Sequence, residues 1–122
     1  MTTRGSTINI QDSVFRSVIR EFEAKTGGQL FGPVSSGCKR EFYCLNPRNW
    51  VWIEEWQDEA GTRRQRKTRY VVLDDRIVKT TDGESYRLVG VDEAKNLLKA
   101  AAKYQTAIRA RLYLPILNTF DL

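Results

Sequence analysis

Aromatic and acidic side chains alternate with other residues from Trp50 to Trp56, and this two-residue period is typical of a β-strand. Further runs rich in β-branched residues follow as far as Val89. Short segments of turn-forming residues separate these runs: Asp58–Gly61, Asp74–Asp75 and Asp82–Gly83. The pattern therefore predicts consecutive β-hairpins. A strand over 41–45 and a turn over 46–49 are predicted to precede them.

An apolar stripe at helical spacing lies before the strands. It consists of Val14, Phe15, Val18, Ile19 and Phe22. Asp12 or Ser13 can cap the N-terminus of this helix, and Gly27-Gly28 is expected to end it. Residues 29–38 mix Gly, Pro and Ser with a few apolar positions, so we expect a loop there.

A second stripe at helical spacing follows the strands. It comprises Ala94, Leu97, Leu98, Ala101, Tyr104, Ile108 and Leu112. Asp92 can cap this helix, which we expect to run to about Tyr113 and to stop at Pro115.

Two amphipathic helices and one sheet predict an α+β fold. We expect a two-layer sandwich in which an antiparallel meander of about five strands carries an N-terminal and a C-terminal helix. The 122 residues fit a single domain, 1–122. Within it, we expect 1–11 to be a flexible N-terminus. Residues 114–122 should form an apolar C-terminal tail that packs on its own sheet or binds another chain.

The turns also predict which residues face each other across the sheet. A type I turn with a glycine bulge at 58–61 and two-residue turns at 74–75 and 82–83 set the registers. The predicted pairs are Trp56–Arg64, Glu54–Arg66, Trp52–Thr68, Trp50–Tyr70, Val72–Ile77 and Lys79–Tyr86. One face should therefore collect the large apolar side chains Trp50, Trp52, Tyr70, Val72, Ile77, Tyr86 and Leu88. We expect Trp52 to be buried against the C-terminal helix, and Trp56 to be exposed near the hairpin tip.

The opposite sheet face is more apolar than a solvated face should be. It is expected to carry Phe42, Cys44, Val51, Ile53, Val71, Leu73, Val78 and Val89. A helix, the 29–38 loop or the tail can cover it, or it can meet a second copy or another partner. Both alternatives stay open at this point. The candidate interface residues are Val51, Ile53, Val71 and Val78.

Basic residues gather on one predicted hairpin, beside Trp56. They are Arg63, Arg64, Arg66, Lys67 and Arg69, and a lysine ridge on the C-terminal helix adds Lys95, Lys99 and Lys103. Such a surface suits a nucleic acid, because the cations contact phosphates while the ring stacks on a base. The candidate nucleic-acid-binding residues are Trp56, Arg63, Arg64, Arg66, Lys67, Lys95, Lys99 and Lys103. The alternative is an internal charge ladder, in which acidic residues of the same hairpin neutralise the arginines and Trp56 lies under Arg64.

The sequence contains no signature of catalysis or of cofactor binding. Histidine, the commonest general base and metal ligand, is absent. Cys38 and Cys44 are too few for a zinc site or a disulfide framework. No glycine-rich phosphate loop or nucleophile motif is present. We therefore expect no enzymatic activity, no cofactor and no metal.

Composition favours a small binding protein. The net charge is +5, and the 41% of hydrophobic residues are enough for a core. No apolar run is long enough to span a membrane and no secretory signal is recognisable, so we expect a cytoplasmic protein without a membrane partner. We expect an adaptor that binds a protein partner, or itself as a homodimer. The alternative is a nucleic-acid-binding domain that uses the basic hairpin and the C-terminal helix.

Overall fold

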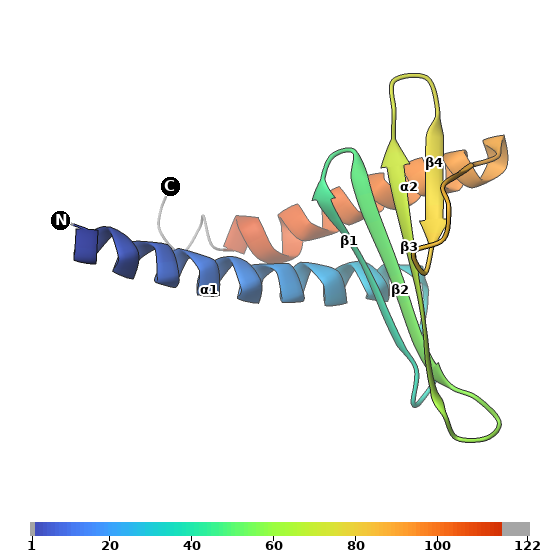
Figure 1. The fold of residues 1–122 in the computed structure, drawn as a ribbon, viewed down its shortest axis with the longest axis horizontal. Helices are drawn as coiled ribbons and strands as arrows, with labels where there is room; N and C mark the ends of the chain where they lie inside the picture. Colours follow the sequence, from blue (N-terminus) through green and yellow to red (C-terminus); the bar gives the residue numbers. More distant parts are fainter. Residues whose placement is uncertain (1, 116–122) are drawn as a thin grey trace.

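The computed structural model describes the backbone of residues 2–115 and the side chains of residues 14–115. The chain forms a helix, a five-stranded antiparallel sheet and a second helix (Figure 1). The strands lie side by side in sequence order, which confirms the predicted α+β meander. Of the predicted tail 114–122, residues 116–122 lie outside the described residues. The elements are α1 Thr2–Gly28, η1 Gln29–Phe31, β1 Lys39–Asn46, β2 Asn49–Gln57, β3 Arg63–Val72, β4 Ile77–Thr81, β5 Arg87–Leu88, α2 Val91–Ile108 and the π-helical η2 Arg109–Tyr113.

The registers of β2 with β3 and of β3 with β4 are those that the turns predict. The observed pairs include Trp56–Arg64, Glu54–Arg66, Trp52–Thr68, Trp50–Tyr70 and Val72–Ile77. In the first of these turns Gly61 has a φ of 82°, and the Asp58 N–H donates to the Thr62 carbonyl over 3.0 Å. Glycine adopts a positive φ at no steric cost, so Gly61 helps to set the β2–β3 register.

The register of β5 differs from the prediction by a single residue. Arg87 takes the place opposite Lys79 that was predicted for Tyr86, because the three residues after the turn leave the ladder and lengthen the connection. A shift of one residue exchanges the two faces of a strand. Leu88 and Tyr86, predicted in the core, are therefore exposed, whereas Val89 is buried in the core instead of lying on the opposite face.

β1 also carries two residues on the face opposite to the predicted one. An irregularity of the ladder between Cys44 and Asn46 brings Phe42 opposite Trp52. Phe42 is therefore almost fully buried in the core, and Cys44 packs against the core, instead of either lying on the second face.

The core lies between one face of the sheet and α2. Its buried residues are Phe42, Trp50, Ile77, Val89, Leu97, Tyr104 and Ile108. The ring of Tyr104 meets those of Trp50 and Phe42 edge-on, at centroid distances of 5.3 and 5.8 Å. Trp52, predicted to be buried against α2, is half-buried, and its ring neighbours are Phe31 and Phe42.

α2 follows the predicted course with small differences. It starts at Val91 after the N-cap residue Gly90, so the predicted cap Asp92 lies in its first turn. Helical backbone continues through η2 to Tyr113 and beyond. Leu98, predicted on the apolar stripe, is exposed, whereas the other stripe residues belong to the core or pack against it.

α1 begins at Thr2, so the predicted start at Asp12 or Ser13 was wrong. The backbone of 2–11 continues the helix, since no proline separates these residues from the stripe. The helix ends at Gly28, as predicted from the glycine pair. The residues that follow form the turn η1, whose Phe31 packs against the core.

The last turn of α1 lies directly against the outer edge of β1. A Cβ atom on Gly27 would lie 1.9 Å from the carbonyl oxygen of Phe42, and one on Gly28 would lie 1.9 Å from that of Arg40. The Arg40 Nε also donates to the Gly28 carbonyl over 2.7 Å. Only glycine permits this approach, and the helix thereby covers a strand edge that would otherwise be open to another chain.

Candidate functional site

α1 projects from the rest of the fold, and its N-terminal half lies away from the sheet (Figure 1). Its predicted apolar stripe is largely uncovered. The exposed fractions of Val14, Phe15, Val18 and Phe22 are 60%, 60%, 59% and 52%, whereas Ile19 is half-buried. We call the first four residues the α1 stripe. More than half of each of these large apolar side chains is left uncovered by the described residues.

A different side of α1 faces the sheet. Arg16, Arg20 and Ala24 line a cavity of about 490 Å³ together with Tyr43 and Ile53 of the second sheet face. The guanidinium of Arg20 lies 5.7 Å from the ring centroid of Tyr43. The helix therefore turns mainly polar residues toward the sheet, and helical periodicity places the α1 stripe on another side.

Glu23 joins α1 to the C-terminal helical segment. Its carboxylate accepts hydrogen bonds from the hydroxyl groups of Tyr104 over 2.9 Å and Tyr113 over 2.6 Å. The bond to Glu23, together with burial, raises the pKa of Tyr113 to about 12. Burial first, and then the same carboxylate, raise the pKa of Tyr104 as well. Both hydroxyl groups therefore remain protonated donors at neutral pH, and they hold α1 in its projecting position.

The predicted interface on the second sheet face is only partly open. Val51 is 1% exposed, because the longer side chains of Tyr43 and Arg69 flank it on the neighbouring strands. Of the two alternatives left open for this face, Val51 fits the covered one. The other predicted interface residues are half-buried: Ile53, Val71 and Val78. The four residues of the α1 stripe are more exposed than these four predicted interface residues.

The basic hairpin extends beyond the level of both helices (Figure 1). Arg63 lies 3.3 Å from the carboxylate of Glu55, and Arg64 lies 2.8 Å from that of Asp58. Hydrogen bonds from the backbone of the turn and from Arg64 lower the pKa of Asp58. These two arginines therefore belong to an internal charge ladder, which was the alternative interpretation of the cluster.

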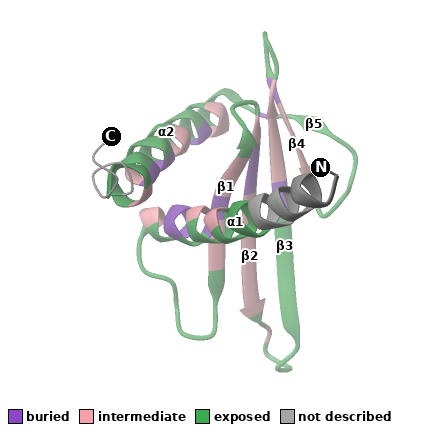
Figure 2. Ribbon diagram, turned by 90° about the vertical axis from the view of Figure 1, so that its left-hand side faces the viewer, coloured by how far each residue is buried: buried purple, intermediate pink, exposed green. Residues whose placement is uncertain are grey.

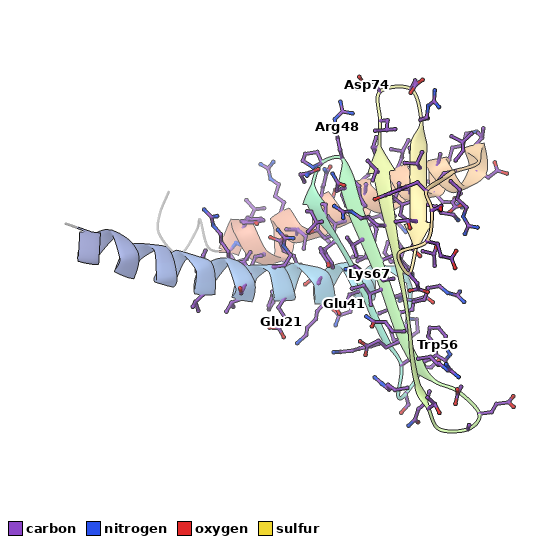
Figure 3. All side chains as sticks on the ribbon, in the orientation of Figure 1. Glu21, Glu41, Arg48, Trp56, Lys67 and Asp74 are labelled. Carbon is purple, nitrogen blue, oxygen red and sulfur yellow. The ribbon has the colours of Figure 1, made fainter. Side chains whose placement is uncertain are left out.

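The three other hairpin cations, Arg66, Lys67 and Arg69, have no carboxylate partner among the described residues. The guanidinium of Arg66 lies 5.7 Å from the ring centroid of Trp56, a place that was predicted for Arg64. Trp56 is half-buried under this contact and not exposed as expected. Lys67 is exposed, and Figure 3 shows it higher on the hairpin than Trp56. The structure thus brings the predicted hairpin residues together, but acidic residues of the same hairpin already neutralise part of their positive charge.

A cleft of about 730 Å³ opens between the sheet and α2. Residues from η1, all five strands and α2 line it, among them Phe31, Trp52, Arg66, Tyr70, Glu93 and Leu97. In its wall Lys79 pairs with Glu93 at 2.6 Å, and the Tyr70 hydroxyl donates to the same carboxylate over 2.8 Å. The bond from Lys79 lowers the pKa of Glu93. No local sequence signal could reveal this cleft, because its residues come from separate elements.

The lysine ridge of α2 lies outside the cleft between the sheet and α2. Lys95, Lys99 and Lys103 are exposed and do not line the cleft. The α2 residues that face Arg66 across the cleft are instead Asn96, Leu97 and Ala100. Of the eight residues predicted to bind nucleic acid, only Arg66 lines the cleft between the sheet and α2.

Comparisons with known proteins add no relative: no family model, no curated protein and no solved structure matches the chain. Within the part that the structure describes, no group of Cys, Asp and Glu side chains is placed to hold a metal ion. Over the same residues, neither helix is long and apolar enough to cross a membrane. The binding properties must therefore be inferred from the surfaces themselves.

Proposed function

We propose that this chain is a non-enzymatic protein-interaction module that pairs with a second copy of itself through the α1 stripe. The observation that supports this function is the exposure of Val14, Phe15, Val18 and Phe22 on a helix whose C-terminal end is anchored to the sheet and to α2. Burying one such side chain contributes about 1.5–3 kcal/mol when it was fully exposed. Pairing would thus give the stripe the burial that the described residues of the single chain do not provide.

A second copy suits the shape of this stripe. In an antiparallel pair of α1 helices centred on Val18, Val14 of one copy lies opposite Phe22 of the other, so a small side chain meets a large one. The arrangement also keeps the two sheets at opposite ends, because each sheet lies at the C-terminal end of its own α1. In this register residues 8–28 of the two helices lie alongside each other, over about 30 Å.

Nucleic-acid binding by the basic hairpin stays an alternative prediction with weaker support. Arg63 and Arg64 already have carboxylate partners. Exposed ion pairs are individually weak, so a phosphate could compete for these arginines, but it would have to displace a partner first. The α1 stripe meets no such competition within the described chain.

Sedimentation velocity of the intact protein tests the proposed pairing. We expect the unmodified chain to sediment as a dimer at micromolar concentration. Val18→Glu places a charge at the centre of the seam and should weaken dimerisation by at least about 100-fold, which corresponds to about 2.7 kcal/mol. Ser17→Glu adds the same charge to the adjacent exposed position off the stripe, and it should leave the dimer intact.

Val18→Glu and Ser17→Glu should unfold at nearly the same temperature as the unmodified protein, when all three are compared at a concentration low enough for the monomer. The reason is that neither side chain packs in the core of the single chain. A clean monomer for the unmodified protein at high concentration would rule out the proposal. Equal dissociation of the Val18→Glu and Ser17→Glu variants would show that the pairing surface is not the α1 stripe.

A further inference from the structure

The outer edge of β3 is open along its N-terminal half. β3 runs from Arg63 to Val72, but β4 pairs with it only from Thr68 onward. Figure 2 shows this half of β3 as exposed. Among the described residues, no strand lies beside Arg63–Lys67 on the side away from β2. An edge of this kind can pair with an extended segment of another chain.

Hydrogen bonds at Lys67 show which backbone groups face the open edge. The Lys67 N–H donates to the carboxylate of Asp82, and the Lys67 carbonyl accepts from the Asp82 N–H, both over 2.8 Å. Backbone groups alternate in direction along a strand. The N–H and C=O groups of Arg63 and Gln65 must therefore face outward as those of Lys67 do, beyond the point where Asp82 ends the pairing.

The chemistry of the edge selects among extended partners. Four of its five side chains are cationic: Arg63, Arg64, Arg66 and Lys67. A second copy of the same edge would place cations opposite cations, which is unfavourable. An acidic segment would instead meet opposite charge at four of the five positions. Asp82 shows the compatibility within the chain itself, because its carboxylate and its backbone both bond to the last residue of this edge.

We propose that β3 binds an extended, Asp- and Glu-rich segment of another protein, which adds a strand beside Arg63–Lys67. Backbone hydrogen bonds to Arg63 and Gln65 hold the segment, and its carboxylates lie near Arg66 and Lys67, which have no carboxylate partner among the described residues. This surface shares no residue with the α1 stripe, so the inference does not rest on the proposed pairing.

Fluorescence anisotropy with the intact protein and a fluorescein-labelled peptide of alternating glutamate and valine tests the proposal. We expect saturable binding that weakens as salt is added. The same peptide with methylated backbone nitrogens keeps its charge but cannot donate to the strand, and it should bind at least about tenfold more weakly. A peptide with lysine in place of glutamate should not bind.

Two substitutions at one edge position separate strand addition from simple charge attraction. Gln65→Pro removes the outward N–H at an edge where proline is tolerated, and it should weaken peptide binding by at least about tenfold. Gln65→Thr keeps the N–H and favours a strand, so it should bind as the unmodified protein does. Val18→Glu should leave peptide binding unchanged, which distinguishes this result from the test of the proposed pairing.

Equal binding of the methylated and unmethylated peptides would overturn the proposal, since charge alone would then explain the affinity. A single-stranded oligonucleotide that binds more tightly than the peptide, with equal affinity for Gln65→Pro and Gln65→Thr, would also overturn it and favour the nucleic-acid alternative. Because the methylated peptide is compared on the unmodified protein, the test holds even if Gln65→Pro disturbs the hairpin.

Discussion

At the scale of single residues, two glycines decide where α1 can lie. The sequence predicts Gly27-Gly28 correctly as the end of the helix. It contains no sign that the same residues contact the carbonyl groups of Phe42 and Arg40, because that contact depends on where a distant strand runs. A glycine pair signals a stop equally well with or without such an approach.

Gly27→Ala separates these two roles by the sign of its effect. Alanine is favoured over glycine in a helix by about 1 kcal/mol. If Gly27 had no close neighbour, Gly27→Ala would therefore stabilise the protein. Here the new Cβ would clash with backbone, and we expect the free energy of unfolding to fall by about 3 kcal/mol or more in a urea titration.

Gly90→Ala is the matched control for this measurement. A Cβ atom at Gly90 meets no other atom within 4 Å, and its φ of −68° suits any residue. Its unfolding free energy should change by less than about 1 kcal/mol. A stabilised Gly27→Ala variant would mean that α1 does not lie against β1 as described.

At the scale of elements, predictability follows from how local the deciding geometry is. The pairing of β2 with β3 could be predicted because one short turn with Gly61 determines it. The register of β5 could not, because residues beyond the turn leave the ladder. The face of Phe42 depends on an irregularity near Cys44 that has no glycine to signal it. In both cases the sequence-based prediction therefore assigned side chains to the wrong face of the sheet.

The two central tryptophans of β2 should differ in their contribution to stability. Trp50 is buried and its ring meets Tyr104 of α2, so Trp50→Ala removes contacts between the two layers. We expect it to cost about 3–5 kcal/mol. Trp52 is half-buried against η1, and Trp52→Ala should cost clearly less, about 1–2 kcal/mol.

Urea unfolding followed by circular dichroism measures both values, because the remaining chromophores of the backbone are unaffected by loss of a tryptophan. If Trp52→Ala were instead the more destabilised variant, the result would support the sequence-based prediction that α2 covers Trp52. It would contradict the packing found here.

At the scale of the whole molecule, the sequence predicts which surfaces are apolar or basic but not what covers them. The sequence predicts that the α1 stripe faces the core, since most amphipathic helices bury their apolar side. In the fold the anchors at Glu23 and Gly27 turn that side outward. The charge of the hairpin is likewise visible in the sequence, whereas its partial neutralisation depends on side-chain placement.

The central claim is that two copies of α1 pair about Val18, and disulfide trapping tests it most directly. Val18→Cys and Ser17→Cys are each prepared with Cys38→Ser, which removes the exposed native thiol. A disulfide requires Cα atoms about 5.5–6 Å apart, a separation that only positions at the centre of a helix seam reach. Under mild oxidation Val18→Cys should form a covalent dimer almost completely, and Ser17→Cys should stay largely monomeric on a non-reducing gel. Equal cross-linking of both variants, or none at position 18, would contradict pairing through α1.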